Sequence, residues 1–290
     1  MLKGKVIKAV GGIFYLSHEG QVFPSAVRKK IRYNNVDLLV GDNVFFKFDE
    51  YGKVVIESAE KRKNQLSRPP IANIDVAVIV ISCIPKPDFY LVDKIVINCY
   101  IQNIRPVLVI NKADLVDEEF EKRVREEYGE MAEAVLTVSA EKEINLDLLK
   151  EQILGKTCVF CGQSAVGKTS LLNKLNDSDQ KVGAVSMKTG RGKHTTRHSQ
   201  IFEIQKDTFV VDTPGFSLLD LKNVKSSELN LYYTDMTTLQ TKCRYHMCTH
   251  TTEPDCEVKK AVEEGRFNKN RYERYLTIYE EIKQAEKNKF

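Results

Sequence analysis

The segment 157–170, TCVFCGQSAVGKTS, constrains the fold of this 290-residue chain more than any other stretch. It opens with an apolar run that has the composition of a buried strand, and it continues into a helix-compatible segment. Between the two lies the pattern G-x-x-x-x-G-K-[ST], formed by Gly162, Gly167, Lys168 and Thr169. Glycines let backbone N–H groups turn toward phosphate oxygens, and the N-terminus of the helix adds positive potential. The segment therefore predicts a phosphate-binding loop for a nucleoside triphosphate, whereas a chance glycine turn is the weaker alternative.

The side chains of this loop have separate predicted roles. Lys168 is expected to reach the β- and γ-phosphates, and the Thr169 hydroxyl is expected to ligate Mg²⁺. Backbone and side chains together predict a set of nucleotide-binding residues here: Gly162, Gln163, Ser164, Ala165, Val166, Gly167, Lys168, Thr169 and Ser170.

A second motif selects the base. The sequence N-K-A-D, made of Asn111, Lys112, Ala113 and Asp114, follows an apolar run at 107–110 that we predict to be a strand. The two oxygens of Asp114 match the N1–H and exocyclic amino donors of guanine, and adenine has no such donor pair. The motif therefore predicts GTP rather than ATP.

The rest of the guanine site is expected around this carboxylate. Asn111 can bridge the base and the phosphate loop, and the stem of Lys112 can pack over the base plane. The backbone N–H groups of Ser139 and Ala140, which follow another predicted strand, can donate to guanine O6.

The γ-phosphate side is predicted from two further segments. Asp212 opens D-T-P-G and is expected to hold Mg²⁺, and the Gly215 N–H is expected to meet the γ-phosphate. The glycine-rich, basic segment 190–198 reads as a mobile loop, in which either Thr195 or Thr196 can complete the Mg²⁺ coordination.

One catalytic feature departs from many GTPases. Phe216 follows D-T-P-G, where a glutamine often orients the attacking water, and a phenyl ring cannot hold water. His194 is our candidate for positioning or polarising that water, although a histidine in a polar loop can also be merely solvated.

Strands and helices alternate between residues 75 and 211, which predicts a parallel α/β sheet with ligands beyond the carboxyl ends of its strands. The motif order is unusual, because N-K-x-D and S-A precede the phosphate loop here and follow it in familiar regulatory GTPases. The same pocket forms if the chain is circularly permuted, and such a chain needs an extra domain to hold its new ends. We therefore predict a permuted GTPase domain over 68–222.

The first segment, 1–67, contains about five short apolar runs separated by turn signals, among them 36–40. This pattern favours a small barrel, and a five-stranded OB-fold that binds RNA is our prediction. The segment holds 12 lysines and arginines against 7 acidic residues. A basic run with an adjacent tyrosine suits RNA phosphates and a stacked base, although a solvated loop is the alternative; the run comprises Arg28, Lys29, Lys30, Arg32 and Tyr33.

The last segment, 223–290, carries the pattern C-x₄-C-x-H-x₅-C, formed by Cys243, Cys248, His250 and Cys256. Three thiols and one imidazole suit a closed, tetrahedral and therefore structural Zn²⁺ site, with His246 as a rival ligand. Helices are predicted at 257–265 and 266–289, and the longer helix has an aromatic face that we expect to be core. Lys269, Arg271 and Arg274 leave RNA contact open there.

Composition limits the remaining choices. No apolar run approaches the length of about 20 residues that spans a bilayer, and the N-terminus lacks the apolar core of a signal peptide. A cytoplasmic protein without membrane contact is therefore expected. We also expect a monomer, although the sequence does not determine the oligomeric state. Cys158 and Cys161 form C-x-x-C, but positions i and i+3 of a strand face opposite ways, so buried structural thiols are predicted instead of a redox or metal pair.

Together these motifs resemble the RsgA (YjeQ or YloQ) family, the circularly permuted GTPases of small-ribosomal-subunit biogenesis. The resemblance covers nearly the whole chain and rests on NKAD, GQSAVGKTS, GRGKHTT, DTPGF and the Cys243/Cys248/His250/Cys256 cluster. It implies an OB-fold, a permuted GTPase domain and a zinc-binding domain. It also implies slow GTP hydrolysis that the small subunit stimulates, His194 as the catalytic histidine, and His250 instead of His246 as the zinc ligand.

We therefore expect a GTP hydrolase that binds small-subunit rRNA in a nucleotide-dependent way during late maturation. A nucleotide-gated RNA-binding module with negligible turnover is the main alternative. Asp114 argues against an ATP-driven RNA remodeller, and a four-ligand metal site without an open position argues against a zinc-dependent hydrolase.

Overall fold

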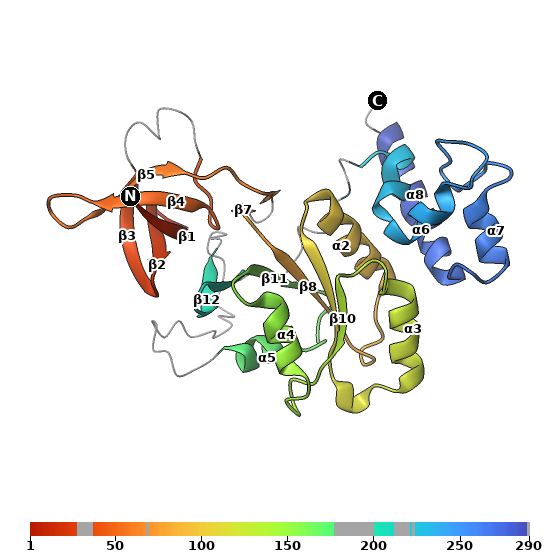
Figure 1. Ribbon diagram of the computed structural model, residues 1–290, viewed down its shortest axis with the longest axis horizontal. Helices are drawn as coiled ribbons and strands as arrows, with labels where there is room; N and C mark the ends of the chain where they lie inside the picture. Colours follow the sequence, from red (N-terminus) through yellow and green to blue (C-terminus); the bar gives the residue numbers. More distant parts are fainter. Residues whose placement is uncertain (28–36, 68–69, 177–199, 212–220, 222–223, 289–290) are drawn as a thin grey trace. The chain divides into compact units, whose positions relative to one another are not determined.

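The structure is a computed structural model that describes residues 1–290 except 28–36, 68–69, 177–199, 212–220, 222–223 and 289–290. A barrel, a six-stranded sheet and a group of helices follow one another along the chain (Figure 1). The chain divides into two compact units, one with residues 1–77, 146–161 and 168–217 and the other with 78–145, 162–167 and 218–290.

Five strands form the N-terminal barrel: β1 Leu2–Val10, β2 Ile13–His18, β3 Gln21–Val27, β4 Asn43–Phe48 and β5 Val54–Ala59. Their order is β1-β2-β3-β5-β4, and β4 pairs with β1 to close the barrel. All pairs are antiparallel except β3 with β5. Side chains that alternate along the strands fill the interior, among them the fully buried Val6, Leu16, Val44, Phe46 and Ile56. The predicted all-β barrel is confirmed.

The apolar run at 36–40 does not add a strand, since residues 37–39 have none and Val40 makes only an isolated bridge to Ile71. The Asp42 carboxylate fixes a turn instead, accepting from the Leu39 N–H at 2.8 Å and from Arg62 Nε at 2.8 Å. This turn buries Leu38 and Val40 without strand pairing. The apolar residues therefore reflect burial in a turn, and the strand that they suggested is absent from residues 37–40.

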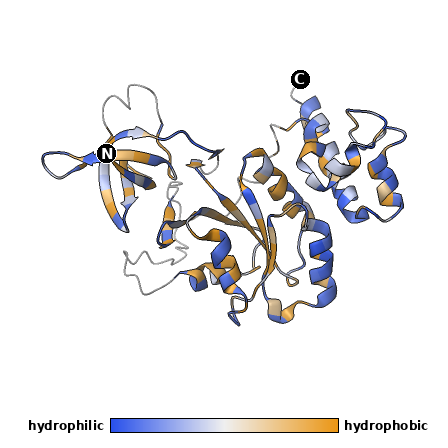
Figure 2. Cartoon of the chain, viewed as in Figure 1, coloured by the Kyte–Doolittle hydropathy of each residue, from blue (hydrophilic) through white to orange (hydrophobic). Residues whose placement is uncertain are grey.

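The central sheet has the order β10-β9-β8-β11-β13-β12. Its strands are β8 Val76–Ile81, β9 Arg105–Ile110, β10 Ala134–Thr137, β11 Thr157–Cys161, β12 Ile201–Gln205 and β13 Thr208–Val211. Every residue of β8 and β11 is buried, and Figure 2 shows these strands as hydrophobic. Pairs β9–β10 and β11–β13 are parallel, as predicted, whereas β12 is an antiparallel edge that its sequence did not indicate.

The strand order explains the unusual motif order. Strands that precede the phosphate loop in the sequence, β8 to β10, lie on one side of β11, and strands that follow it, β12 and β13, lie on the other. Joining or cutting the chain elsewhere would leave this spatial order unchanged. A circular permutation therefore preserves the sheet while it reorders the motifs.

Among the described residues, four α-helices and a short 3₁₀ turn accompany the sheet: α2 Phe89–Ile101, α3 Glu118–Tyr128, α4 Leu146–Ile153, α5 Lys168–Leu175 and η1 Ala113–Leu115. Aspartates cap two of them, because Asp88 accepts from the Leu91 N–H and Asp117 from the Phe120 N–H. Strands β6 Gln65–Ser67 and β7 Pro70–Ala72 pair antiparallel with each other.

The C-terminal segment forms η3 Ser226–Tyr232, α6 Thr234–Gln240, α7 Glu257–Glu263 and α8 Lys269–Lys287. The predicted aromatic face of α8 is core in part, with Tyr275, Tyr279 and Ile282 buried. Arg271 is also buried and Arg274 is mostly so, both in ion pairs with Asp93. Both arginines therefore have a structural role, and the burial of Arg271 removes it from the RNA contact that the sequence left open. Among the described residues, no helix is both long and apolar enough to cross a membrane.

Candidate nucleotide-binding and metal sites

The phosphate loop needs glycine at two positions because of its neighbours. Gly162 has φ of +121°, and a Cβ there would lie 2.1 Å from the carbonyl oxygen of Val80. Gly167 has φ of +93°, and a Cβ there would lie 2.2 Å from Asn111 Nδ2. The loop is thus packed directly against the end of β8 and against the guanine motif, which only a residue without a side chain permits.

Replacing Gly162 by alanine is expected to displace the phosphate loop from β8 and to weaken GTP binding by at least about tenfold, since backbone strain alone costs about 1–3 kcal/mol. Titration with a fluorescent GTP analogue measures this loss. Gly155 is the matched control, because its φ is +67° but a Cβ there would have nothing within 4 Å. Gly155→Ala should cost stability without changing nucleotide affinity, and equal affinities of the two variants would contradict the argument.

Asn111 joins three segments. Its Nδ2 donates to the carbonyl oxygen of Val166 at 2.9 Å, and its Oδ1 accepts from the Ala140 N–H at 3.2 Å. Its own N–H donates to the carbonyl oxygen of Ile81, so the residue is held at the end of β9. One buried side chain therefore ties the guanine motif to the phosphate loop and to the Ser139-Ala140 turn, as the sequence predicted for the phosphate loop.

Lys112 adds a second tie to the same loop. Its backbone is left-handed, with φ of 65°, and its Nζ donates to the carbonyl oxygens of Ala165 at 3.0 Å and Ile84 at 2.6 Å. The contact with Ile84 was not anticipated, because nothing in the sequence shows that the segment after β8 returns to this lysine. The ammonium group is thus fixed, and the alkyl stem is held along the guanine motif.

Asp114 lies exposed in η1. The Ser139 hydroxyl donates to its Oδ1 at 2.6 Å, and this hydrogen bond lowers the pKa of the carboxyl group. An ionised carboxylate only accepts hydrogen bonds, which is what the donor edge of guanine requires. The Ser139 N–H donates to the carbonyl oxygen of Ile144 and the Ala140 N–H to Asn111, so both predicted O6 donors already have backbone or side-chain acceptors.

Helix α5 begins at Lys168, with Thr169 and Ser170 exposed in its first turn. Burial lowers the pKa of Lys168, and the nearby Cys161 opposes this shift. Cys161 and Cys158 are both buried, and burial raises the pKa of Cys161 to about 12. Both C-x-x-C thiols are therefore buried core groups, as predicted. Cys83 is only half-buried.

Several predicted residues lie outside the described ranges. These are the candidate catalytic His194, the candidate γ-phosphate and magnesium residues Thr195, Thr196, Asp212 and Gly215, the neighbouring Phe216, and the basic run Arg28, Lys29, Lys30, Arg32 and Tyr33. The geometry described above therefore concerns only the phosphate loop and the residues proposed to bind guanine.

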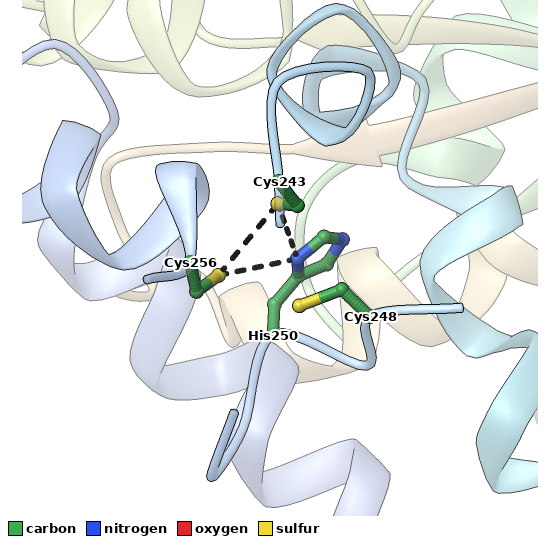
Figure 3. Close-up of side chains that lie close together, drawn as sticks. All are labelled: Cys243, Cys248, His250 and Cys256. Carbon is green, nitrogen blue, oxygen red and sulfur yellow. Dashed lines mark hydrogen bonds between the residues drawn. The ribbon is translucent and has the colours of Figure 1, made fainter. Parts of the chain in front are cut away.

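The predicted metal ligands converge. Ligand atoms of Cys243, Cys248, His250 and Cys256 all lie within 4.8 Å of one another (Figure 3). His250 Nδ1 is 3.4 Å from Cys256 Sγ and 3.7 Å from Cys243 Sγ, and the two sulfurs are 4.0 Å apart. Tetrahedral bonds of zinc to sulfur and nitrogen place such atoms about 3.6–3.8 Å apart, so this donor set fits the ion. His246 is exposed and lies outside the cluster.

Surrounding groups hold the cluster in shape. The Tyr272 hydroxyl donates to the carbonyl oxygen of His250 at 2.7 Å. The Glu253 carboxylate accepts from the N–H groups of Thr249 and Thr251, at 2.7 and 3.0 Å. Burial opposes ionisation of Glu253, but these hydrogen bonds prevail and lower its pKa to about 2. The turn that carries His250 is thus fixed from both sides.

Comparison with known proteins places these sites in a family. The family model RsgA GTPase matches residues 59–222, and the model RsgA N-terminal domain matches residues 3–56. The small ribosomal subunit biogenesis GTPase RsgA of Clostridium botulinum (strain Eklund 17B / Type B) is 42% identical over 293 residues, covering 100% of both chains. The protein of that name from Geobacillus sp. (strain WCH70) is 40% identical and covers 98% of both.

Solved structures agree with this relationship. The crystal structure of YjeQ from Thermotoga maritima matches with a TM-score of 0.81 and 33% identity, covering 97% of this chain and 98% of that one. The crystal structure of YloQ, described as a circularly permuted GTPase, matches with a TM-score of 0.80 and 30% identity, covering 98% and 96%. The motifs, the permuted strand order and these full-length matches lead to one conclusion: the chain belongs to the RsgA family of GTPases.

Proposed function

We propose that this protein hydrolyses GTP and acts in late maturation of the small ribosomal subunit, which it binds in a nucleotide-dependent way. The proposal that the protein binds GTP depends on one observation: the Asn111 side-chain amide donates to Val166 and so joins the guanine motif to the phosphate loop. The full-length relatives are named small ribosomal subunit biogenesis GTPases, which supports the ribosomal part. The proposed domains are 1–67, 68–222 and 223–290.

The proposed nucleotide contacts follow from the chemistry of the motif residues. Asp114 accepts from the guanine edge, the Lys112 stem covers the base, and Lys168 meets the β- and γ-phosphates. When bound, Mg²⁺ neutralises charge on the phosphate oxygens, and we assign Thr169, Asp212 and one of Thr195 or Thr196 to hold it. The four-residue cluster of Cys243, Cys248, His250 and Cys256 holds a structural Zn²⁺ in this proposal, because it leaves no open position for chemistry.

The barrel and the metal-binding domain are the proposed rRNA-binding parts of a cytoplasmic monomer. On the barrel, Lys3 lies over Phe45 and Lys8 over Tyr15, at 5.7 and 5.8 Å from the ring centroids. Surface lysines beside aromatic rings suit phosphates and stacked bases.

Binding to purified small subunits tests the function. Sedimentation in the presence of a non-hydrolysable GTP analogue is expected to show at least about tenfold tighter binding than in the presence of GDP. Equal affinities would refute the nucleotide-dependent role. GTP turnover measured with and without subunits separates an enzyme from a nucleotide-gated RNA-binding module, because the latter has negligible turnover in both conditions.

His194→Ala is expected to lower kcat by about 10²-fold or more with little loss of GTP affinity, since it removes the proposed water-positioning group. His198→Ala is the matched control, because it alters a histidine of the same loop without a proposed catalytic role. Single-turnover hydrolysis, with and without small subunits, measures the effect. An unchanged kcat for His194→Ala in both conditions would exclude the catalytic role.

A further inference from the structure

The phosphate loop is tied to the start of helix α2 by one side chain. Gln163 Oε1 accepts from the Asp88 N–H at 3.0 Å, and its Nε2 donates to the carbonyl oxygen of Lys86 at 3.2 Å. Asp88 is the N-cap of α2, where its carboxylate accepts from the Leu91 N–H. A displacement of the loop at Gln163 therefore acts directly on the first turn of this helix.

Helix α2 carries the contact to the C-terminal segment. A helix of its length spans about 20 Å and moves as one element, because its backbone hydrogen bonds are internal. On its first two turns, the Tyr90 hydroxyl donates to Glu281 Oε2, and Lys94 Nζ lies 2.8 Å from Glu281 Oε1. Glu281 belongs to α8, so both bonds join α2 directly to that helix.

A buried charge cluster fixes the same two helices in register. Asp93 of α2 is fully buried and accepts from Arg274 Nε at 2.6 Å and from Arg271 Nη1 at 3.2 Å. Arg274 also donates to Glu127 of α3 at 2.7 Å, and Arg271 to Asp235 at 2.5 Å. Buried charges are strongly destabilising when a partner is lost, so α8 cannot slide on α2 without a large cost. The cluster therefore fixes the two helices at one point, and their relative orientation depends on the second contact, at Glu281.

Helix α8 in turn contacts the metal-binding turn. The Tyr272 hydroxyl donates to the carbonyl oxygen of His250 at 2.7 Å, and the Tyr275 hydroxyl donates to that of Thr249 at 2.5 Å. A continuous set of hydrogen bonds and ion pairs thus leads from Gln163, through α2 and α8, to the backbone of a metal ligand.

We propose that helices α2 and α8 couple the phosphate loop to the metal-binding domain, with the contact of Lys94 and Tyr90 to Glu281 as its adjustable part. This inference rests on the proposed binding of guanine nucleotide. It adds a structural path by which the bound nucleotide alters the surface of the metal-binding domain that a partner would contact. Coupling of this kind is reciprocal, so a partner bound to the metal-binding domain also alters nucleotide affinity.

A charge-reversal cycle at Lys94 and Glu281 tests the route, because neither residue lies in the nucleotide site and both side chains are partly exposed. The variants are Lys94→Glu, Glu281→Lys and the double variant, with zinc-loaded full-length protein throughout. Fluorescent GDP titration comes first, and all variants are expected to stay within about twofold of the unmodified protein. Hydrogen exchange of residues 243–256 and of α8 is then compared with and without saturating GDP.

GDP is expected to change exchange in these segments several-fold in the unmodified protein. Each single variant should reduce that change by at least half, and the double variant should restore most of it. Glu280→Lys is the matched control, because Glu280 is the adjacent residue of α8 and pairs with Lys283 of its own helix at 3.8 Å. That control should respond to GDP like the unmodified protein.

The contrary results are distinct. Unchanged exchange in a protein that binds GDP would overturn the coupling and leave the proposed function standing. A double variant as unresponsive as the single variants would also overturn it, because the side chains would then act by local loosening and not as a pair. Failure of the unmodified protein to bind GDP would refute the proposed function and the coupling with it.

Discussion

Asp114→Asn is expected to abolish selective GTP binding and to transfer it to xanthosine triphosphate. The asparagine amide offers one donor and one acceptor, whereas the guanine edge presents two donors and xanthine presents one donor and one acceptor. Sites built on such hydrogen bonds discriminate by large factors, so GTP affinity should fall on the order of 10³-fold. Competition between GTP, ATP and xanthosine triphosphate for a fluorescent nucleotide measures the exchange of selectivity.

Asp117→Asn provides the control for this substitution. Asp117 lies three residues further along and caps α3 by accepting from the Phe120 N–H at 2.7 Å. Asparagine is an equally good N-cap, so this variant should keep both stability and GTP preference. Unchanged GTP affinity of Asp114→Asn would show that the base lies elsewhere, and the guanine site would then be wrongly assigned.

Removal of the metal is expected to have the second large effect. Structural zinc contributes apparent binding free energies of about 10–16 kcal/mol in small zinc-binding modules, and most helices around the cluster are short. Cys256→Ala, or a strong chelator, should therefore unfold residues 243–263 and lower the thermal unfolding temperature. Metal content by mass spectrometry and hydrogen exchange of this segment measure both consequences.

Two substitutions make the metal prediction specific. His250→Ala should lose zinc, whereas His246→Ala should retain it, because His246 is exposed outside the cluster. Cys99→Ala removes a buried thiol far from the cluster in sequence and should cost only about 1 kcal/mol for the small cavity. Full stability of the purified protein without zinc would contradict the structural role of the metal.

Most strand and helix positions follow from local pattern. The predicted alternation of strands and helices is confirmed from β8 to α5. Continuous apolar runs such as β11 and β13, and a capped, amphipathic segment such as α3, are strong local signals. The failures involve pairing partners that lie far away in sequence. β12 is a strand only because it pairs antiparallel with β13, and the run at 36–40 is not a strand because Asp42 fixes a turn there.

The residues of the candidate site can also be separated into those that local motifs identify and those that only contacts between distant segments reveal. Spacing within short segments identifies Asn111, Asp114, Lys168 and the four metal ligands, since each motif is local in the chain. The ties of Gln163 to Asp88 and of Lys112 to Ile84 join segments 28 or more residues apart, and no spacing rule reports them. Arg271 illustrates a wrong expectation of exposure. A basic residue beside an apolar helix face is expected to be solvent-exposed, but Arg271 is buried in an ion pair with Asp93, a residue distant in sequence.

The sequence by itself determined which chemical groups this protein offers: a glycine-rich phosphate-loop motif, the Asp114 carboxylate that we propose selects guanine, and three thiols with an imidazole that could hold a metal. These depend on residue types at fixed short spacings, which the backbone geometry of a loop or turn translates directly into positions. Only the tertiary structure decided that Asn111 joins these loops and that α2 and α8 are held by a buried charge cluster. Such contacts depend on the burial of groups distant in the chain, and burial is a property of the folded molecule.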